Sequence, residues 1–248
     1  MIGSGRPGFV LDEFQRRALE HLDAGRSVLV SAPTGAGKTV VADHAVDRAL
    51  AAGQRAFYTA PIKALSNQKY RDLRQRLGPN RVGLLTGDNV IAGDADVVVM
   101  TTEVLRNMLY AEAVDARLGA VVLDEVHYLE DRYRGPVWEE VILHLPSSVV
   151  LVCLSATVSN HEHLGGWLKR VRGPTAVVAE SRRPVPLTNL YAVGRRRSDA
   201  VQIVPTLVDG RPNPEGGRFD PPAGSQAPRS PGRPRRGGAG GSDRSRQD

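Results

Sequence analysis

Residues 27–39 read SVLVSAPTGAGKT, and this stretch decides the fold. An apolar run from Val28 to Val30 leads into a glycine-rich turn, and the helix-compatible sequence VVADHAVDRALAA follows at residues 40–52. A buried strand that enters a helix through such a turn is typical of a phosphate-binding loop, because backbone N–H groups and the helix dipole converge there on an anion. The stretch therefore predicts a nucleoside triphosphate site within an α/β fold.

Each residue type in this loop has a use in holding phosphate. Glycine lets the backbone approach phosphate oxygens without a Cβ in the way. Lys38 is expected to reach the β- and γ-phosphates, and the hydroxyl of Thr39 is expected to ligate Mg²⁺. The expected nucleotide contacts in the loop are Thr34, Gly35, Ala36, Gly37, Lys38 and Thr39. The strand and helix patterns on either side disfavour a chance Lys-Thr after a glycine-rich turn.

Length and composition set the outer limits. The chain has 248 residues, of which 41% are hydrophobic, enough to bury one substantial core. Its formal net charge of +6 suits a polyanionic partner without proving one. The single cysteine, Cys153, lies in the apolar run VVLVCLSA and is expected in the core. The first residues lack a secretory signal and no stretch has the length of a membrane helix, so we expect a cytoplasmic, monomeric protein without membrane contact.

Strand-like and helix-like segments alternate up to about residue 193. An opening helix is expected near residues 12–24. The expected strands are residues 28–31, 56–60, 82–86, 96–101, 120–124, 149–154 and 175–179, with a last candidate at 187–193. Short apolar strands separated by amphipathic helices predict a mostly parallel, doubly wound sheet with helices on both faces. Ligands of such a sheet bind beyond the carboxyl ends of its strands.

A second motif, VVLDEVHYLEDRYRG at residues 121–135, is an apolar strand that ends in two acids. Asp124 and Glu125 are expected to share Mg²⁺, and Glu125 to orient and deprotonate the attacking water. Adjacent buried carboxylates are costly unless a cation compensates them, which favours a metal–nucleotide site. His127 is expected to bond across the sheet to the third motif, Ser155 to Thr157, and His127, Ser155 and Thr157 complete the expected catalytic set with Lys38.

These motifs together resemble the Ski2-like superfamily 2 RNA helicases, and the overall likeness is to a bacterial, actinobacterial type. The segments APTGAGKT, PIKALSNQK, TTEVLRNML, DEVHYL, RG-x-x-WEE and LSATVSN follow one another in that family's order, over roughly residues 8–193. Ala32 replaces the first glycine of the general loop pattern, as in superfamily 2 helicases. The resemblance implies a RecA-like P-loop NTPase domain that binds ATP and Mg²⁺, with single-stranded nucleic acid crossing its top.

The resemblance also implies individual contacts. Gln15 would hydrogen-bond the adenine edge, and Phe9 would pack either on the base or in the core. The implied nucleic-acid contacts are Pro61, Lys63, Gly87, Asp88, Thr101 and Thr102. Lys63 is either a phosphate contact or a solvated lysine. The two threonines are either helix caps or phosphate contacts, and the two roles are compatible.

The composition changes near residue 209. We expect a RecA-like domain at residues 1–193, the start of a linker at 194–208 and a disordered low-complexity tail at 209–248. The segment RSPGRPRRGGAGG, residues 229–241, is either an RNA-binding tail or an unstructured end. The sequence lacks the Q-x-x-G-R-x-G-R element of a second RecA-like domain, so we expect this chain alone to bind ATP but to hydrolyse it slowly.

Three functional interpretations remain open. The first is the motor domain of an ATP-dependent RNA helicase. The second is a non-enzymatic nucleotide- and RNA-binding fragment, and the third is a DNA helicase domain, because sequence hardly separates readers of RNA from readers of DNA. A metal site at His161 and His163 is set aside, since residues two apart on a helix do not face each other. The basic clusters at residues 182–183 and 195–197 are interpreted as solvated.

Overall fold

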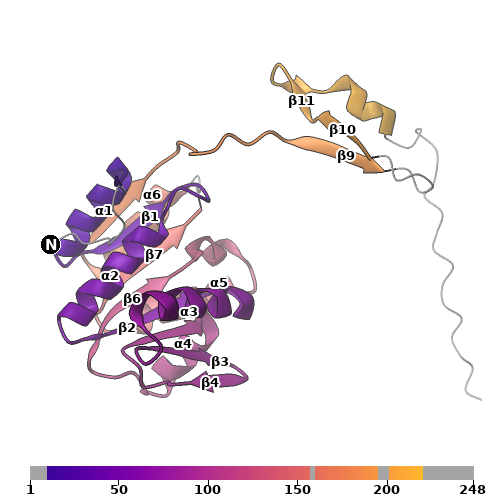
Figure 1. Ribbon diagram of the computed structural model, residues 1–248. Coiled ribbons are helices and arrows are strands. Elements are labelled where there is room, and N and C mark those ends of the chain that lie inside the picture. The colour runs from indigo at the N-terminus through magenta and orange to yellow at the C-terminus, as the bar shows by residue number, and fades with distance from the viewer. Residues whose placement is uncertain (1–9, 157–159, 195–200, 220–248) are drawn as a thin grey trace, which may run out of the picture. The chain divides into compact units, whose positions relative to one another are not determined.

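The computed structural model describes residues 10–156, 160–194 and 201–219. The chain divides into two compact units, Met1–Pro186 and Leu187–Asp248, which are described separately. Figure 1 shows the elements of each unit. Phe9, Thr157 and the tail beyond residue 219 lie outside the described residues, and so do the predictions made for them.

The first unit is built on one eight-stranded sheet. Across the sheet its strands are β4 (Asn89–Ile91), β3 (Val82–Thr86), β5 (Val97–Thr101), β2 (Arg55–Ala60), β6 (Leu118–Leu123), β7 (Val150–Ser155), β1 (Ser27–Ser31) and β8 (Thr175–Ala179). All neighbouring strands are parallel except β3 and β4, which pair antiparallel. The predicted α/β class with a mostly parallel sheet is confirmed.

Helices cover both faces of this sheet. The helices are α1 (Glu13–Asp23), α2 (Thr39–Ala51), α3 (Lys63–Leu77), α4 (Thr102–Tyr110), α5 (Gly135–His144) and α6 (His161–Arg172), with a 3₁₀ turn η1 (Val126–Glu130) after β6. One buried cluster joins α1, α2 and α3 to the sheet, and a second joins α4, α5 and α6 to it. Side chains alternate between the clusters along a strand, since Val28 and Val30 belong to the first and Leu29 to the second.

Strand β4 is absent from the sequence-based prediction. It is only three residues long and fully exposed, so it carries no apolar run to reveal it. Strand β4 folds back against β3, and the chain just after β4 passes close to Gly83 of β3. A Cβ on Gly83 would lie 2.0 Å from the carbonyl oxygen of Ala92. Glycine at this position therefore permits the chain to come back alongside β3.

The second unit differs from the expected linker and tail. The structure pairs β9 (Leu190–Gly194) with β10 (Val201–Pro205), and β11 (Leu207–Val208) with β12 (Arg211–Pro212), before a 3₁₀ segment η2 (Pro214–Phe219). The first unit ends at Pro186, so the strand expected at residues 187–193 belongs here. The overlooked signal is Asp209-Gly210, whose positive φ values of 50° and 74° suit a tight hairpin turn.

None of the helices in the described part of the chain has the length and apolar character needed to cross a membrane.

Candidate nucleotide and nucleic-acid site

Three motifs far apart in the sequence meet at the carboxyl edge of the sheet. The phosphate-binding loop follows β1, Asp124 follows β6, and Ser155 ends β7, while the sheet order places β6, β7 and β1 side by side. The backbone N–H of Ala32 donates to the carbonyl of Ser155 at 3.2 Å. The hydroxyl of Ser31 donates to the carbonyl of Ala156 at 3.3 Å. These contacts join the loop directly to the third motif.

The loop has the backbone of an anion cradle. Gly35 and Gly37 adopt φ values of +84° and +83°, a region that side chains disfavour. The backbone N–H groups of Gly35, Gly37, Lys38 and Thr39 donate to no other atom of the described residues. Helix α2 begins at Thr39, so its N-terminus points into the same place. Four unpaired N–H groups at a helix N-terminus form a site for phosphate oxygens.

Gln15 holds this loop through hydrogen bonds from its side chain. Its Oε1 accepts from the backbone N–H of Asp12 at 2.9 Å, and its Nε2 donates to the carbonyls of Ala36 at 3.3 Å and Gly37 at 3.2 Å. The residue is only 2% exposed. Its amide is thus used to hold the loop, and the adenine contact expected of Gln15 stays a prediction.

Lys38 lies between the loop and the two acids. Its Nζ donates to the carbonyls of Ala32 at 2.7 Å and Pro33 at 3.1 Å. Burial lowers the pKa of Lys38, while the negative charges of Glu125 and Asp124 oppose that shift. The ammonium group therefore interacts electrostatically with both carboxylates, and it belongs to the same loop as the unpaired N–H groups.

Asp124 is held by three hydrogen bonds. Its Oδ2 accepts from the hydroxyl of Tyr58 at 2.7 Å, and its Oδ1 accepts from the backbone N–H of Glu125 at 2.9 Å. Its own N–H donates to the carbonyl of Thr59 at 3.0 Å. The carboxylate is half-buried, so it is fixed in place and still reachable by a ligand.

Glu125 occupies an unusual backbone conformation. Its φ of 54° and ψ of 44° lie in the left-handed region, which a residue with a Cβ adopts at a cost of ~1–3 kcal/mol. Oε2 of Glu125 lies 3.3 Å from Nδ1 of His127. Strained residues of this kind cluster at active sites. Here the left-handed conformation of Glu125 lets the chain turn from the end of β6 into η1.

The expected bond between His127 and Ser155 is not formed. Nδ1 of His127 lies 3.3 Å from Oε2 of Glu125. Oγ of Ser155 is buried and has no hydrogen-bond partner among the residues described. The expected bond from His127 to the third motif stays a prediction, because Thr157 of that motif lies outside the described residues. A buried hydroxyl without a partner at the carboxyl edge marks a place where a ligand or a neighbouring group would bond.

The residues expected to touch nucleic acid lie along the same edge, at the starts of α3 and α4 and in the turn between β3 and β4. Nζ of Lys63 lies 2.8 Å from Oδ1 of Asp88, which also accepts from the hydroxyl of Thr86 at 3.0 Å. The hydrogen bonds from Lys63 and Thr86 lower the pKa of the Asp88 carboxyl. Pro61 is buried behind Lys63, and Gly87 is exposed beside Asp88. Lys63 is thus paired with Asp88, an arrangement that the motif did not reveal.

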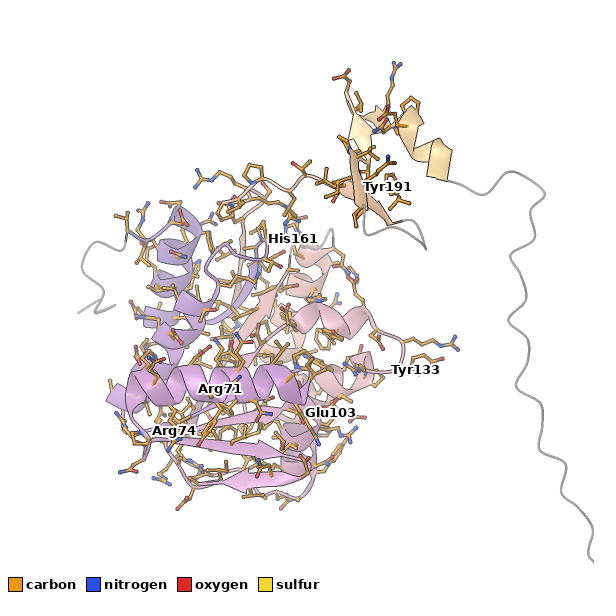
Figure 2. The ribbon with its side chains drawn as sticks, turned by 45° about the vertical axis from the view of Figure 1, so that its right-hand side comes forward. Arg71, Arg74, Glu103, Tyr133, His161 and Tyr191 are labelled. Carbon is orange, nitrogen blue, oxygen red and sulfur yellow. The ribbon has the colours of Figure 1, made fainter. Side chains whose placement is uncertain are left out.

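Thr101 and Thr102 open α4 without serving as visible caps. Thr101 occupies the N-cap position, but its side chain makes no capping hydrogen bond. Thr102 is fully buried, and its Oγ1 has no partner in the described part of the chain. In Figure 2, Arg71 projects from α3 and Tyr133 from the loop before α5.

Tyr58 is the site residue that sequence reasoning missed. The sequence places it only within the strand expected at residues 56–60, yet its hydroxyl donates to Asp124, which lies 66 positions further along the chain. A signal existed, because a buried tyrosine hydroxyl needs a partner and a strand that ends beside an acidic motif offers one.

The family model described as DEAD/DEAH box helicase matches residues 12–164. The probable helicase HelY of Mycobacterium leprae is 62% identical over 192 residues, which are 77% of this chain and 21% of that protein. The chloroplastic DExH-box ATP-dependent RNA helicase DExH15 of Arabidopsis thaliana is 53% identical over 187 residues, 73% of this chain and 16% of that protein.

Among solved structures, the helicase Lhr of Mycobacterium smegmatis, bound to single-stranded DNA and AMP-PNP, superposes with a TM-score of 0.56 at 29% identity. The match covers 68% of this chain and 26% of Lhr. The chain thus spans about a fifth of the length of its curated relatives. The RecA-like fold expected from the motifs is confirmed by these similarities.

Proposed function

The chain belongs to the DEAD/DEAH box helicase family, in its Ski2-like branch, and we propose that it is the ATP- and nucleic-acid-binding motor domain of an ATP-dependent RNA helicase. One observation carries the proposal. The N–H cradle at residues 35–39, the Lys38 ammonium and the Asp124–Glu125 pair converge at one edge of the sheet. A cradle of donors facing two acids is the arrangement that a magnesium nucleotide requires.

The donor set fits Mg²⁺ held together with phosphate. Magnesium is usually bound through one or two carboxylates plus substrate phosphates, not by a cage of protein ligands. Within the described ranges no group of three or more His, Cys, Asp or Glu side chains is placed to hold a metal ion. We therefore propose that Thr39, Asp124 and Glu125 serve the ion alongside the nucleotide, and that Mg²⁺ neutralises phosphate charge when bound.

The chain's own residues then have separate tasks. The N–H groups of the loop and the Lys38 ammonium bind and orient the β- and γ-phosphates. Glu125, at the end of β6, would accept a proton from the attacking water. Ser155, whose buried Oγ lacks a partner among the described residues, would bond to His127 or to a closing element when nucleotide is held. Adenine would lie beside Gln15.

Nucleic acid is proposed to cross the edge formed by Pro61, Lys63, Gly87, Asp88, Thr101 and Thr102. We favour RNA because the relative DExH15 is named an RNA helicase, whereas Lhr was solved with single-stranded DNA.

We also propose that the chain acts as a monomer in the cytoplasm. Light scattering after size exclusion tests the oligomeric state, and a dimer at micromolar concentration would contradict it.

The test is direct binding of a fluorescent ATP analogue to the 248-residue chain, with Mg²⁺ and with EDTA. We expect magnesium-dependent binding, and folded protein that takes up no nucleotide would overturn the proposal. RNA preference is tested with RNA and DNA single strands of matched sequence at two salt concentrations, since phosphate contacts make affinity salt-dependent. Equal affinity for both strands at both salts would refute the preference for RNA.

A further inference from the structure

We propose that Tyr58 is a positioning residue for the metal site: its hydroxyl holds the Asp124 carboxylate in the orientation that receives Mg²⁺. This inference rests on the function proposed above, because it assigns a task within the same site. Tyr58 lies on β2, outside the three motifs that define the site, and its role comes from the packing of the sheet.

The sheet register brings Tyr58 to Asp124. On the neighbouring strand β6, Tyr58 pairs with Val122 and Thr59 pairs with Leu123, the last residue before Asp124. The Tyr58 side chain runs beside the end of β6, and its hydroxyl lies 2.7 Å from Oδ2 of Asp124. Since the backbone of Thr59 also accepts from the Asp124 N–H at 3.0 Å, β2 holds this residue by both main chain and side chain.

The hydroxyl acts as a donor to an ionised carboxylate. Tyr58 is 1% exposed, and burial together with the charge of Asp124 raises its pKa well above the usual range of a tyrosine. A tyrosine hydroxyl carries its proton at neutral pH, so it can donate to a carboxylate oxygen. A hydrogen bond from a neutral donor to a charged acceptor is among the stronger kinds in proteins, and 2.7 Å is a typical length for one.

The two donors divide the Asp124 carboxylate between them. Tyr58 bonds to Oδ2 and the Glu125 N–H bonds to Oδ1, so rotation about the carboxylate would break one bond or both. Each oxygen keeps a second lone-pair site for a cation or its water. Partners that orient a metal-binding carboxylate are typically worth about 10–100-fold in metal affinity or activity.

The tyrosine ring is itself held in place. Nζ of Lys69, on α3, lies 4.9 Å from the centroid of the Tyr58 ring. A cation over the face of a buried phenol favours one ring position. Lys69 lies six residues after Lys63, which begins α3, so the ring of Tyr58 contacts the helix that is expected to meet nucleic acid. Tyr58 thus has a fixed geometry from which to orient Asp124.

The experiment is a Mg²⁺ titration of fluorescent-nucleotide binding to the Tyr58→Phe chain. We expect the Mg²⁺ concentration at half-saturation to rise about ten-fold or more, while nucleotide binding in EDTA changes little. The matched control is Tyr70→Phe, which removes a hydroxyl from a partly buried tyrosine of α3 away from the carboxylates. A Tyr58→Phe titration curve that coincides with the Tyr70→Phe curve would overturn the inference.

A second measurement serves if Tyr58→Phe does not fold. 3-Fluorotyrosine placed only at position 58 keeps the hydroxyl and supplies one ¹⁹F signal. We expect it to retain the wild-type Mg²⁺ midpoint, and its ¹⁹F resonance to shift as Mg²⁺ is added to nucleotide-saturated protein. A resonance that does not move would refute the positioning role. Failure of the wild-type chain to bind magnesium nucleotide would instead refute the proposed function itself.

Discussion

The two halves of the carboxyl edge are built in opposite ways. On the nucleotide side, Asp124 is held by Tyr58, and the loop is held by Gln15, which is almost fully buried. On the nucleic-acid side, the side chains of Lys63 and Asp88 are 54% and 69% exposed and are paired with each other. The groups of the nucleotide side are thus held in place by buried hydrogen bonds. Those of the nucleic-acid side are exposed to solvent, and their opposite charges pair with each other.

This difference predicts how each half responds to change. A buried, hydrogen-bonded group leaves its partners unsatisfied when it is removed, which is costly. An exposed ion pair is worth little and is screened by salt. Substitutions on the nucleotide side should therefore have large effects that do not depend on salt, and substitutions on the nucleic-acid side should have small effects that do.

The largest effect is expected for Lys38→Ala. The substitution removes the one ammonium group placed between the loop carbonyls and the acidic pair, so binding of magnesium nucleotide should fall below detection. Fluorescence titration measures this, and Lys169→Ala, at an exposed site on α6, is the control. Wild-type nucleotide affinity in Lys38→Ala would remove Lys38 from the site.

Next in size is Glu125→Gln. The amide cannot accept the proton of the attacking water, so hydrolysis should drop by ~10² or more while nucleotide affinity is kept. Single-turnover hydrolysis of labelled ATP is the suitable measurement, because it separates the chemical step from nucleotide binding and product release. The control is Glu20→Gln on the exposed side of α1. Normal turnover in Glu125→Gln would show that another group is the base.

How much of this could be predicted from sequence depends on the distance between the residues involved. Strand β1, the loop and α2 are contiguous, so local apolar pattern and glycine placement predict them. The Tyr58–Asp124 bond joins residues 66 apart, and the Lys63–Asp88 pair joins two separate motifs. Strand order and register create these contacts, and neither is readable from a single segment. The left-handed Glu125 and the Gln15 support of the loop depend on packing in the same way.

A third prediction compares two glycines of the loop. Gly35 and Gly37 have nearly equal positive φ, so alanine at either should cost ~1–2 kcal/mol in backbone strain. A Cβ on Gly35 meets no atom within 4 Å, whereas one on Gly37 would lie 2.6 Å from Nε2 of Gln15. Gly37→Ala should therefore be less stable than Gly35→Ala in chemical denaturation. Equal stability of the two variants would show that the Gln15 amide moves aside at little cost in free energy.

The smallest effects are expected at the Lys63–Asp88 pair, where the sign is the informative part. If Asp88 occupies the ammonium that a phosphate would use, Asp88→Asn should raise affinity for single-stranded RNA about two- to five-fold at low salt. Lys63→Ala should lower the affinity for RNA, and should reduce the slope of log affinity against log salt by ~0.7, the share of one phosphate contact.

The lowered pKa keeps Asp88 ionised throughout the neutral range, so salt and not pH is the variable to change. Asp94→Asn, an exposed acid in the turn after β4, removes the same charge away from Lys63 and serves as the control. If Asp94→Asn raises the affinity for RNA as much as Asp88→Asn does, the gain reflects net charge alone. The Lys63–Asp88 ion pair then does not compete with phosphate for Lys63.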